Sequence, residues 1–287
     1  MNFSLDGIES LIELAFCEDD ITNDLTTLCC GEGAERPVRA DIVVKKESIL
    51  AGAPVVEKII EFAGKKNIVQ PIRLSVLAKE GTLATSGSPW MILEGRSRDL
   101  LCLERVLMNF LIRMSGIATA TRRIVAELEG TNCKVLHTRK TVPGHRTTDI
   151  YACLIGGAQP HRKSLGDAIL VKENHLRTAK SFQHLFDGIN EFRSKASFVE
   201  IEVTSLLELK HAIAGKPDRV LLDNFTLEDC EKAVNLFGSS VQLEASGNID
   251  ETNVKQYALT GVDFVSLGSI THSVRAADLS MLFHDKT

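Results

Sequence analysis

From about residue 133 onwards, short apolar segments alternate with amphipathic helical segments, and this alternation sharply limits the possible folds. Six strand-like segments are centred near residues 136, 170, 201, 221, 243 and 265, the last four at intervals of roughly 20 to 22 residues. One β-loop-α-loop unit has this length, and successive parallel units either close into a barrel or wind into an open sheet. A doubly wound dinucleotide-binding sheet usually carries G-x-G-x-x-G at its first turn, and that motif does not occur in the chain. We therefore expect an α/β fold with a complete or incomplete barrel, and keep the doubly wound sheet as the alternative.

The first hundred residues predict a separate α+β unit. Ser4 is a plausible N-cap for a helix whose apolar positions begin at Leu5, and a second helix is expected at 54–64 between Pro54 and Gly64. Strands are expected at 38–44, 72–78 and 90–95. A long helix starts near residue 97, with a further helix at about 117–129. We place the domains at 1–112 and 113–287, with the C-terminal tail returning toward the first.

The charge distribution favours small anions as ligands. Residues 96–175 hold 13 Lys or Arg against 7 Asp or Glu, although the whole chain has a formal net charge of −5. A nucleic-acid-binding domain usually shows a basic surface over its whole extent, whereas a single basic block suits an anion pocket. No apolar stretch is long enough to cross a bilayer, and the N-terminus lacks a basic signal-peptide region. With seven cysteines and no C-x-x-C, the chain fits a cytoplasmic protein with reduced thiols.

Polar residues stand at the carboxyl ends of the expected strands, which would meet at one mouth of a barrel. Cations suited to carboxylates and phosphates are Arg139, Lys140, Arg162, Lys172 and, on the long helix, Arg105. Glu202 and Asp223 end adjacent strands and could hold Mg²⁺, possibly through water. The alternative is that these two acids pair with the cations and only stabilise the barrel.

Small residues follow the last two strands, in EASGNI and SLGSITHS. Backbone N–H groups at such turns can bind a phosphate, and barrels often place a phosphate site after their last two strands. No H-E-x-x-H spacing supports zinc, and no G-x-S-x-G elbow supports a serine nucleophile.

Several longer blocks resemble the quinolinate phosphoribosyltransferase family. The blocks, in the order and approximate spacing of that family, are LERVLMNFLIRMSGIAT (103–119), HTRKTVPGHR (137–146), GGAQPHRKSLGDAILVKENH (156–175), VEIEV (199–203), LLDNF (221–225), LEASGNI (243–249) and GVDFVSLGSITHS (261–273). They cover nearly all of residues 100–273, while the N-terminal part, with NDLTT at 23–27, resembles the family more loosely.

The resemblance implies an N-terminal α/β sandwich and an incomplete α/β (TIM-like) barrel, assembled as a homodimer or a multiple of dimers. The implied reaction joins quinolinate and 5-phosphoribosyl 1-pyrophosphate, giving nicotinate mononucleotide, pyrophosphate and CO₂, with Mg²⁺, in NAD biosynthesis. Neither a nucleic acid nor a membrane is implied as a partner. The residues implied to bind quinolinate are Arg105 from the neighbouring subunit, Thr138, Arg139, His161, Arg162 and Lys172. Those implied to bind the phosphoribosyl pyrophosphate are Lys140, Glu202, Asp223, Ser246, Gly247, Asn248, Leu267, Gly268 and Ser269, of which Lys140, Glu202 and Asp223 serve catalysis.

The sequence departs from the family at Ala158, where a third glycine is usual, at Val142 in place of threonine and at His145 in place of an apolar residue. We expect Ala158 to matter if its backbone needs a positive φ, and His145 to add a pH-sensitive contact near the mouth. The alternatives are a paralogue of the molybdenum operon acting on another small carboxylate, a barrel that binds a flavin or sugar phosphate, and a non-catalytic interaction protein.

Overall fold

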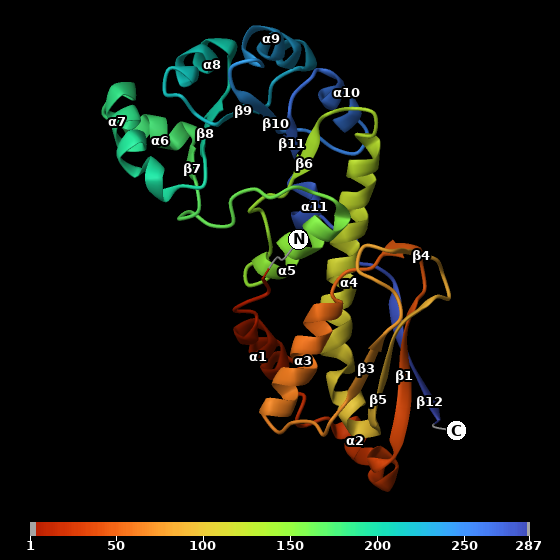
Figure 1. The fold of residues 1–287 in the computed structure, drawn as a ribbon. Coiled ribbons are helices and arrows are strands. Elements are labelled where there is room, and N and C mark those ends of the chain that lie inside the picture. Colours follow the sequence, from red (N-terminus) through yellow and green to blue (C-terminus); the bar gives the residue numbers. More distant parts are fainter. Residues whose placement is uncertain (1–3, 286–287) are drawn as a thin grey trace. The chain divides into compact units, whose positions relative to one another are not determined.

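The computed structural model describes residues 4–285, which form two compact units that interleave along the sequence (Figure 1). The first unit takes the chain as far as Thr121, then Thr141–Gly156, and then the C-terminal residues from Ser273. The second unit consists of Arg122–Lys140 and Gly157–His272. The boundary expected after residue 112 falls inside one long helix.

The first unit combines an antiparallel sheet with helices. Its helices are α1 (Glu9–Glu18), α2 (Leu25–Cys29), the 3₁₀ turn Gly31–Glu35, α3 (Ala53–Lys65), most of α4 (Ser97–Glu127) and α5 (Arg146–Gly156). Its strands are β1 (Pro37–Val44), β2 (Ser48–Ile49), β3 (Arg73–Val76), β4 (Leu83–Ala84), β5 (Pro89–Arg96) and β12 (Leu279–Asp285). The main sheet has the order β12-β1-β5-β3, and β2 pairs separately with β4. The strands expected at 38–44, 72–78 and 90–95 and the helix expected at 54–64 are thus confirmed.

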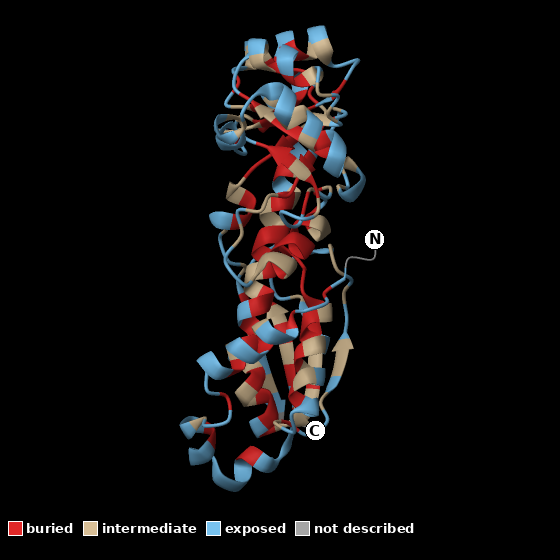
Figure 2. Ribbon diagram, turned by 90° about the vertical axis from the view of Figure 1, so that its left-hand side faces the viewer, coloured by how far each residue is buried: buried red, intermediate tan, exposed pale blue. Residues whose placement is uncertain are grey.

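Alternating side chains bury one face of this sheet. Val38, Ala40, Ile42 and Val44 of β1 are all buried, with the residues between them more exposed (Figure 2). This period of two is what a strand with a single covered face requires. Helix α3 buries Val55, Val56, Ile59 and Ala63 at helical spacing, which makes it the matching amphipathic layer.

The last strand completes the first sheet. β12 pairs antiparallel with β1 from Val44↔Leu279 to Val38↔Asp285, so the two ends of the chain share one sheet. The expected return of the tail is visible in this pairing. Just before β12, the Ala277 N–H donates to the Ile112 carbonyl in α4 at 2.9 Å.

Two local expectations were wrong. The first helix begins at Glu9 rather than after Ser4, whose hydroxyl instead accepts the Asp6 N–H in a turn. The segments at 97–114 and 117–129 form one continuous helix, α4, because Gly116 does not break it. Gly116 serves close packing instead: a Cβ there would lie 2.5 Å from the Arg275 carbonyl oxygen.

The second unit is the expected incomplete barrel. Its strands are β6 (Lys134–Leu136), β7 (Ile169–Val171), β8 (Val199–Val203), β9 (Arg219–Asp223), β10 (Gln242–Ser246) and β11 (Phe264–Ser266). Its helices are α6 (Glu173–Thr178), α7 (Phe182–Phe192), the 3₁₀ turn Arg193–Lys195, α8 (Leu206–Ile213), α9 (Leu227–Phe237), α10 (Val254–Leu259) and α11 (Ser269–His272).

The strand order identifies a barrel with one gap. All pairings are parallel in the order β6-β11-β10-β9-β8-β7, so the first strand lies beside the last instead of beside the second. This is the cyclic order of a βα barrel, open within the described residues between β6 and β7. Hydroxyl caps start several outer helices: Ser181, Ser205 and Thr226 each accept a backbone N–H of the first helical turn.

Over residues 4–285, no helix combines the length and the apolar character needed to span a membrane.

Glu80 stabilises the start of α3, which leads to a prediction about stability. Its carboxylate accepts the N–H groups of Gly52 and Ala53 at 2.9 to 3.1 Å and the Tyr151 hydroxyl at 3.0 Å. Replacing Glu80 by alanine removes the acceptor of these hydrogen bonds and should lower the free energy of unfolding by about 2 to 3 kcal/mol. Thermal denaturation measures the loss, and Glu47→Ala, at an exposed position, is the control. Equal melting temperatures for the two variants would contradict this role of Glu80.

Candidate active site

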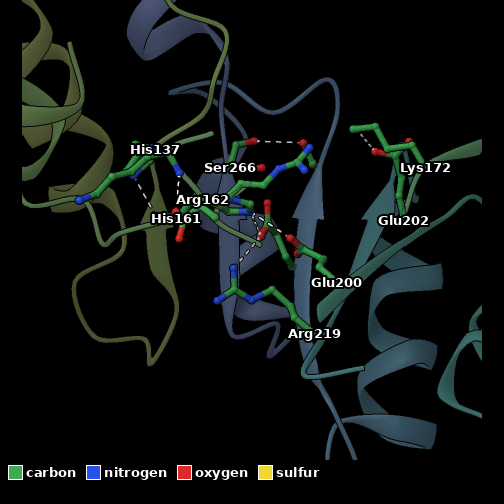
Figure 3. A network of polar contacts seen from close by, with 12 residues as sticks. His137, His161, Arg162, Lys172, Glu200, Glu202, Arg219 and Ser266 are labelled. Atoms are coloured by element: carbon green, nitrogen blue, oxygen red, sulfur yellow. Dashed lines mark hydrogen bonds and ion pairs between the residues drawn. The ribbon is translucent and has the colours of Figure 1, made fainter. Parts of the chain in front are cut away.

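The carboxyl ends of the six parallel strands surround one pocket of about 310 Å³ within the second unit. Every strand, or the loop directly after it, contributes to the wall, which a flat sheet could not achieve. The lining residues are His137, Thr138, Arg139, Lys140, His161, Arg162, Leu170, Lys172, Glu202, Leu221, Asp223, Glu244, Ser246 and Ser266. Figure 3 shows several of these side chains. The polar residues at the strand ends, which are scattered along the sequence, therefore lie close together, as expected.

Most of the predicted site residues line this pocket. They are Thr138, Arg139, Lys140, His161, Arg162, Lys172, Glu202, Asp223 and Ser246. Gly247 and Asn248 follow β10, and Leu267, Gly268 and Ser269 follow β11, next to the pocket wall. Arg105 does not line the pocket: it is exposed on α4, in the part of that helix that belongs to the first unit.

Arg139 and Arg162 supply positive charge that no acid neutralises. Neither guanidinium forms an ion pair with a carboxylate among residues 4–285, and the buried Nε of Arg139 has no hydrogen-bond partner. Burial lowers the pKa of Arg162, and the charge of nearby Arg139 lowers it further. Two arginines that repel each other in a largely buried wall form a site prepared for an anion.

The acids at the mouth behave differently from each other. Glu202 on β8 pairs closely with Lys172, which follows β7 (Figure 3). Asp223, which ends β9, accepts a hydrogen bond from the Asn224 side-chain amide at 2.9 Å and has no cation within ion-pair distance in the described chain. The alternative of purely structural pairing therefore applies to Glu202 and not to Asp223. Two carboxylates on adjacent strands are hard oxygen ligands, and this donor set fits a largely hydrated Mg²⁺.

The turn after β10 requires a glycine. Gly247 has φ +93°, and a Cβ on it would lie 2.3 Å from the Asn224 side-chain oxygen. The Asn224 N–H donates to the Ser246 carbonyl at 2.8 Å, and the Asn248 amide donates to the Asn224 oxygen at 3.0 Å. The turns after β9 and β10 thus hold each other, with their small residues beside the pocket.

Two side chains approach the backbone at the turn after β11. A Cβ on Gly268 would lie 2.8 Å both from Lys140 Cδ and from His272 Nε2. Gly268 therefore lets Lys140 and His272 approach the same backbone. The sequence analysis missed His272, the last residue of α11, although a residue four positions after Gly268 in a helical segment lies on the same side of the helix.

A buried polar network lies beneath the pocket. His161 Nε2 is 3.0 Å from Glu200 Oε2 and 3.4 Å from Glu244 Oε2, and Arg219 Nη1 is 3.2 Å from the same Glu244 oxygen (Figure 3). Glu200 and Glu244 are fully buried. The sequence analysis missed Glu200, Arg219 and Glu244. The alternation of side chains between the two faces of a strand could have indicated them. Glu200 stands two residues before Glu202 and so shares its face of β8.

The titration of this network follows from its burial. Burial and the nearby charge of Glu244 raise the pKa of Glu200 to about 7. Burial opposes ionisation of Glu244 too, but hydrogen bonds from His161 and Ser266 and the charge of Arg219 lower its pKa to about 2. The cationic Arg219 thus faces the ionised carboxylate of Glu244, while Glu200 holds a proton readily.

His161 experiences two opposing influences. Burial lowers its pKa, whereas the hydrogen bonds to Glu200 and Glu244 act to raise the pKa. However, the Arg162 N–H donates to Nδ1 at 2.7 Å, which requires a free lone pair there. Two N–H groups cannot face each other at that distance, so the geometry decides for a neutral ring with its proton on Nε2. His161, Glu200 and Glu244 have ligand-type atoms close enough for a metal, but the N–H groups of His161 and Arg219 already serve these carboxylates.

None of the three departures from the family is among the residues that line this pocket. Ala158 is buried and is absent from the residues with positive φ, whereas Gly157 has φ +108°, so the backbone at 158 does not need glycine. Val142 and His145 belong to the first unit and do not line the pocket. The His145 ring packs against Phe110, with 5.9 Å between ring centroids, and burial lowers its pKa.

A second pocket, of about 730 Å³, lies beside β7, α6 and α7. Its wall is mainly aliphatic and aromatic, with residues such as Leu165, Leu185 and Phe192. It is larger than the pocket at the strand ends and shares Arg162 with it, but among its lining residues the only other lysine or arginine is Lys195 and none is an acid. It therefore lacks the combination of cations and acids found at the strand ends.

The sequence matches the family profiles of both domains of one enzyme family. Residues 117–282 match the quinolinate phosphoribosyl transferase C-terminal domain, and residues 20–115 match the N-terminal domain. The chain belongs to the quinolinate phosphoribosyltransferase family.

Curated proteins and solved structures agree with this membership. The chain is 34% identical to a nicotinate-nucleotide pyrophosphorylase (carboxylating) of Mycobacterium leprae, over 96% of this chain and 97% of that protein. It is 32% identical to a probable nicotinate-nucleotide pyrophosphorylase (carboxylating) of Bacillus subtilis, over 96% of this chain and 92% of that one. The solved structure of the Francisella tularensis nicotinate-nucleotide pyrophosphorylase is 36% identical, covers 96% of each chain and superposes with a TM-score of 0.89. The similarity therefore spans both domains of the family.

The geometry at Gly247 leads to a prediction. Gly247→Ala forces a Cβ against Asn224 at an unfavourable φ and should lower the stability of the barrel by about 1 to 3 kcal/mol, seen as a lower melting temperature. Gly64→Ala is the matched control, because Gly64 lies in α3 with no heavy atom within 4 Å of its Cβ position. That helical substitution should leave stability unchanged or raise it by about 1 kcal/mol. Equal melting temperatures for the two alanine variants would show that the turn tolerates a side chain.

Proposed function

We propose that this chain transfers the phosphoribosyl group of 5-phosphoribosyl 1-pyrophosphate to quinolinate and releases pyrophosphate and CO₂, forming nicotinate mononucleotide for NAD biosynthesis. The observation that carries the proposal is the pair of uncompensated arginines, Arg139 and Arg162, at a barrel mouth that also has two small-residue turns. The family membership supports it, as do relatives named for this product.

The basic wall suits the dicarboxylate. Arg139 and Arg162 offer planar donor pairs, with Thr138 beside them, and Lys172 can exchange Glu202 for a substrate carboxylate. His161 supports this wall from beneath, since both of its ring nitrogens already have partners. The two carboxyl groups of quinolinate are adjacent on the ring, so several cations in one wall can orient the ring nitrogen.

The opposite part of the mouth suits the phosphoribosyl pyrophosphate. The turns Ser246-Gly247-Asn248 and Leu267-Gly268-Ser269 provide small residues and backbone N–H groups for the 5′-phosphate. Lys140 approaches Gly268 and can reach the same substrate. Glu202 and Asp223 would hold Mg²⁺, directly or through water, and this ion would neutralise charge on the pyrophosphate.

The residues of the chain assist the reaction by charge and position. The quinolinate nitrogen attacks C1 of the ribose, and the bond from C1 to the pyrophosphate oxygen breaks. Lys140 stabilises the negative charge that gathers on the leaving pyrophosphate. Glu202 and Asp223 favour the positive character that develops on the ribose. The bond from the ring to the carboxylate next to the nitrogen then breaks and releases CO₂. The cationic ring nitrogen stabilises the carbanion left on that carbon, which takes a proton from solvent to give nicotinate mononucleotide.

One assay tests the proposed reaction. Quinolinate labelled in the carboxyl group next to the nitrogen should release labelled CO₂ only when phosphoribosyl pyrophosphate and Mg²⁺ are both present. Arg162→Ala should raise the KM for quinolinate steeply, because a largely buried carboxylate loses a charge-assisted partner worth about 2 to 5 kcal/mol.

Lys163→Ala is the matched control, because this exposed neighbour of Arg162 does not line the pocket. It should leave the KM for quinolinate within about twofold of the wild-type value. If the wild-type protein releases no CO₂, the chain acts on another carboxylate, such as that of the molybdenum-operon paralogue. An unchanged KM in Arg162→Ala would remove Arg162 from the quinolinate site.

We further propose that the working unit is a homodimer in which Arg105 enters the site of the neighbouring subunit. Arg105 is exposed on α4 and does not line the pocket of its own chain. A cation on an exposed helix face can act on a symmetry-related site, since each subunit of a twofold dimer presents the same surface to the other.

Mixed dimers test the origin of Arg105. Co-expressed Arg105→Ala and Lys172→Ala chains should regain about one quarter of the wild-type activity, because half of the random dimers carry one intact site. Arg139→Ala mixed with Lys172→Ala is the control, since both residues line the same pocket and no intact site can form. Equal, negligible activity in the two mixtures would mean that Arg105 is not contributed by the partner.

The cysteines bear on the compartment. All seven are free, and four of them are exposed or half-buried. Exposed thiols without disulfides are typical of a reducing environment, and we therefore propose the cytoplasm as the compartment.

A further inference from the structure

The loop that carries Arg162 is held by side chains instead of by secondary structure. Residues 160–163 have no helical or strand assignment. Three consecutive backbone N–H groups donate to side chains: His161 to His137 Nε2 at 3.0 Å, Arg162 to His161 Nδ1 at 2.7 Å, and Lys163 to Asp167 Oδ2 at 2.8 Å. The position of this backbone therefore depends on how those side chains are fixed.

The His161 ring is the central support of the loop. Its Nδ1 accepts the Arg162 N–H, and its Nε2 faces Glu200 and Glu244 at 3.0 and 3.4 Å. The ring also meets Phe198 edge-on, with centroids 5.4 Å apart. One face of the loop is thereby connected to the floor of the barrel through a single imidazole.

The carboxylates below His161 are themselves held rigidly. Glu200 comes from β8 and Glu244 from β10, and Arg219 comes from β9, which lies between those strands. The guanidinium of Arg219 contacts Glu244 at 3.2 Å and lies over the Phe264 ring at 4.1 Å and the Phe198 ring at 5.2 Å. Figure 3 shows Arg219 and Glu200 below His161, on the far side from Lys172 and Glu202.

Stability alone does not account for two buried carboxylates. Desolvating such groups costs more than their pairing usually returns, and apolar side chains of the same volume often stabilise a protein. Both oxygens of Glu200 and Oε1 of Glu244 are buried without a hydrogen-bond partner other than the His161 contact to Glu200 Oε2. A requirement for specific geometry explains why the barrel interior tolerates these groups.

We propose that Glu200 and Glu244, the latter held by Arg219, are positioning residues that fix His161 and, through its hydrogen bond to the Arg162 N–H, set the Arg162 guanidinium in place before substrate binds. Glu200 does not line the pocket, and Glu244 reaches the wall with its carboxylate already engaged by His161 and Arg219. The inference rests on the proposed function in one respect, namely that Arg162 binds a carboxylate of quinolinate.

Two substitutions at Glu200 separate positioning from stability. Glu200→Leu fills the space but accepts no hydrogen bond from His161 Nε2, so the KM for quinolinate should rise about fivefold or more, with the KM for phosphoribosyl pyrophosphate within about twofold of wild type. The melting temperature of this variant should not fall, because an apolar side chain replaces a buried carboxyl group that is costly to desolvate. Glu200→Gln keeps an oxygen acceptor and should restore most of the quinolinate affinity.

Hydrogen exchange of the peptide covering residues 158–166 gives a readout that does not depend on turnover. Its amides should exchange faster in Glu200→Leu than in wild type or in Glu200→Gln. Leu209→Ala is the control for general destabilisation, because Leu209 is buried on α8 and belongs neither to the hydrogen-bond network nor to the pocket lining. It should lower the melting temperature and leave exchange in 158–166 and both KM values unchanged.

The outcomes distinguish the two proposals. If wild type does not turn over quinolinate, the proposed function fails, and the exchange experiment still decides whether the carboxylates hold the loop. If wild type is active, but Glu200→Leu leaves both exchange in 158–166 and the KM for quinolinate unchanged, the positioning role is wrong. The same holds if Leu209→Ala changes them as much as Glu200→Leu does.

Discussion

The cyclic order of six parallel strands is the constraint on which the rest of the second unit depends. Because all the strands run in one direction, their carboxyl ends meet at one mouth. The register of the strand pairing then determines which strand-end residues are neighbours: Ser246 lies opposite both Asp223 and Ser266. The polar residues of the site thus owe their proximity to strand pairing, and no single segment of the chain contains the site.

The period of two along each strand divides the interior into two levels. At the mouth are Lys172, Glu202, Asp223 and Ser246, and below them are Glu200, Arg219 and Glu244. In the lower level, His161 contacts both carboxylates and Arg219 contacts Glu244, away from solvent. At the mouth, Arg139 and Arg162 have no acid of their own, so the positive charge stands where a ligand can reach it. The barrel therefore has contacts between charged groups at its lower level and positive charge without an ion-pair partner at its mouth.

Much of this arrangement was predictable from the sequence. The spacing of the βα units predicted the barrel, and the polar residues near the strand ends predicted the charged residues of the pocket wall, because both depend on local sequence patterns. The roles of Thr138 and His161 came from the family resemblance. The lower level was missed, since Glu200 and Glu244 lie inside strands and their partners come from other strands. The continuity of α4 was also missed: Gly116 looked like a helix boundary, and only the packing of residue 275 against it explains the glycine. Whether Arg105 reaches a neighbouring subunit depends on contacts between chains, which a single chain does not contain.

The pairing of β12 with β1 has a consequence for biosynthesis. During translation, β1 can pair with β5 early, but its other edge must wait for residues 279–285, which follow the whole barrel in the sequence. Throughout translation of the barrel, the amino-terminal sheet therefore carries an unprotected edge that other nascent chains could join. A product terminated directly after the barrel would contain the residues of the basic mouth but would leave the free edge of β1 unpaired.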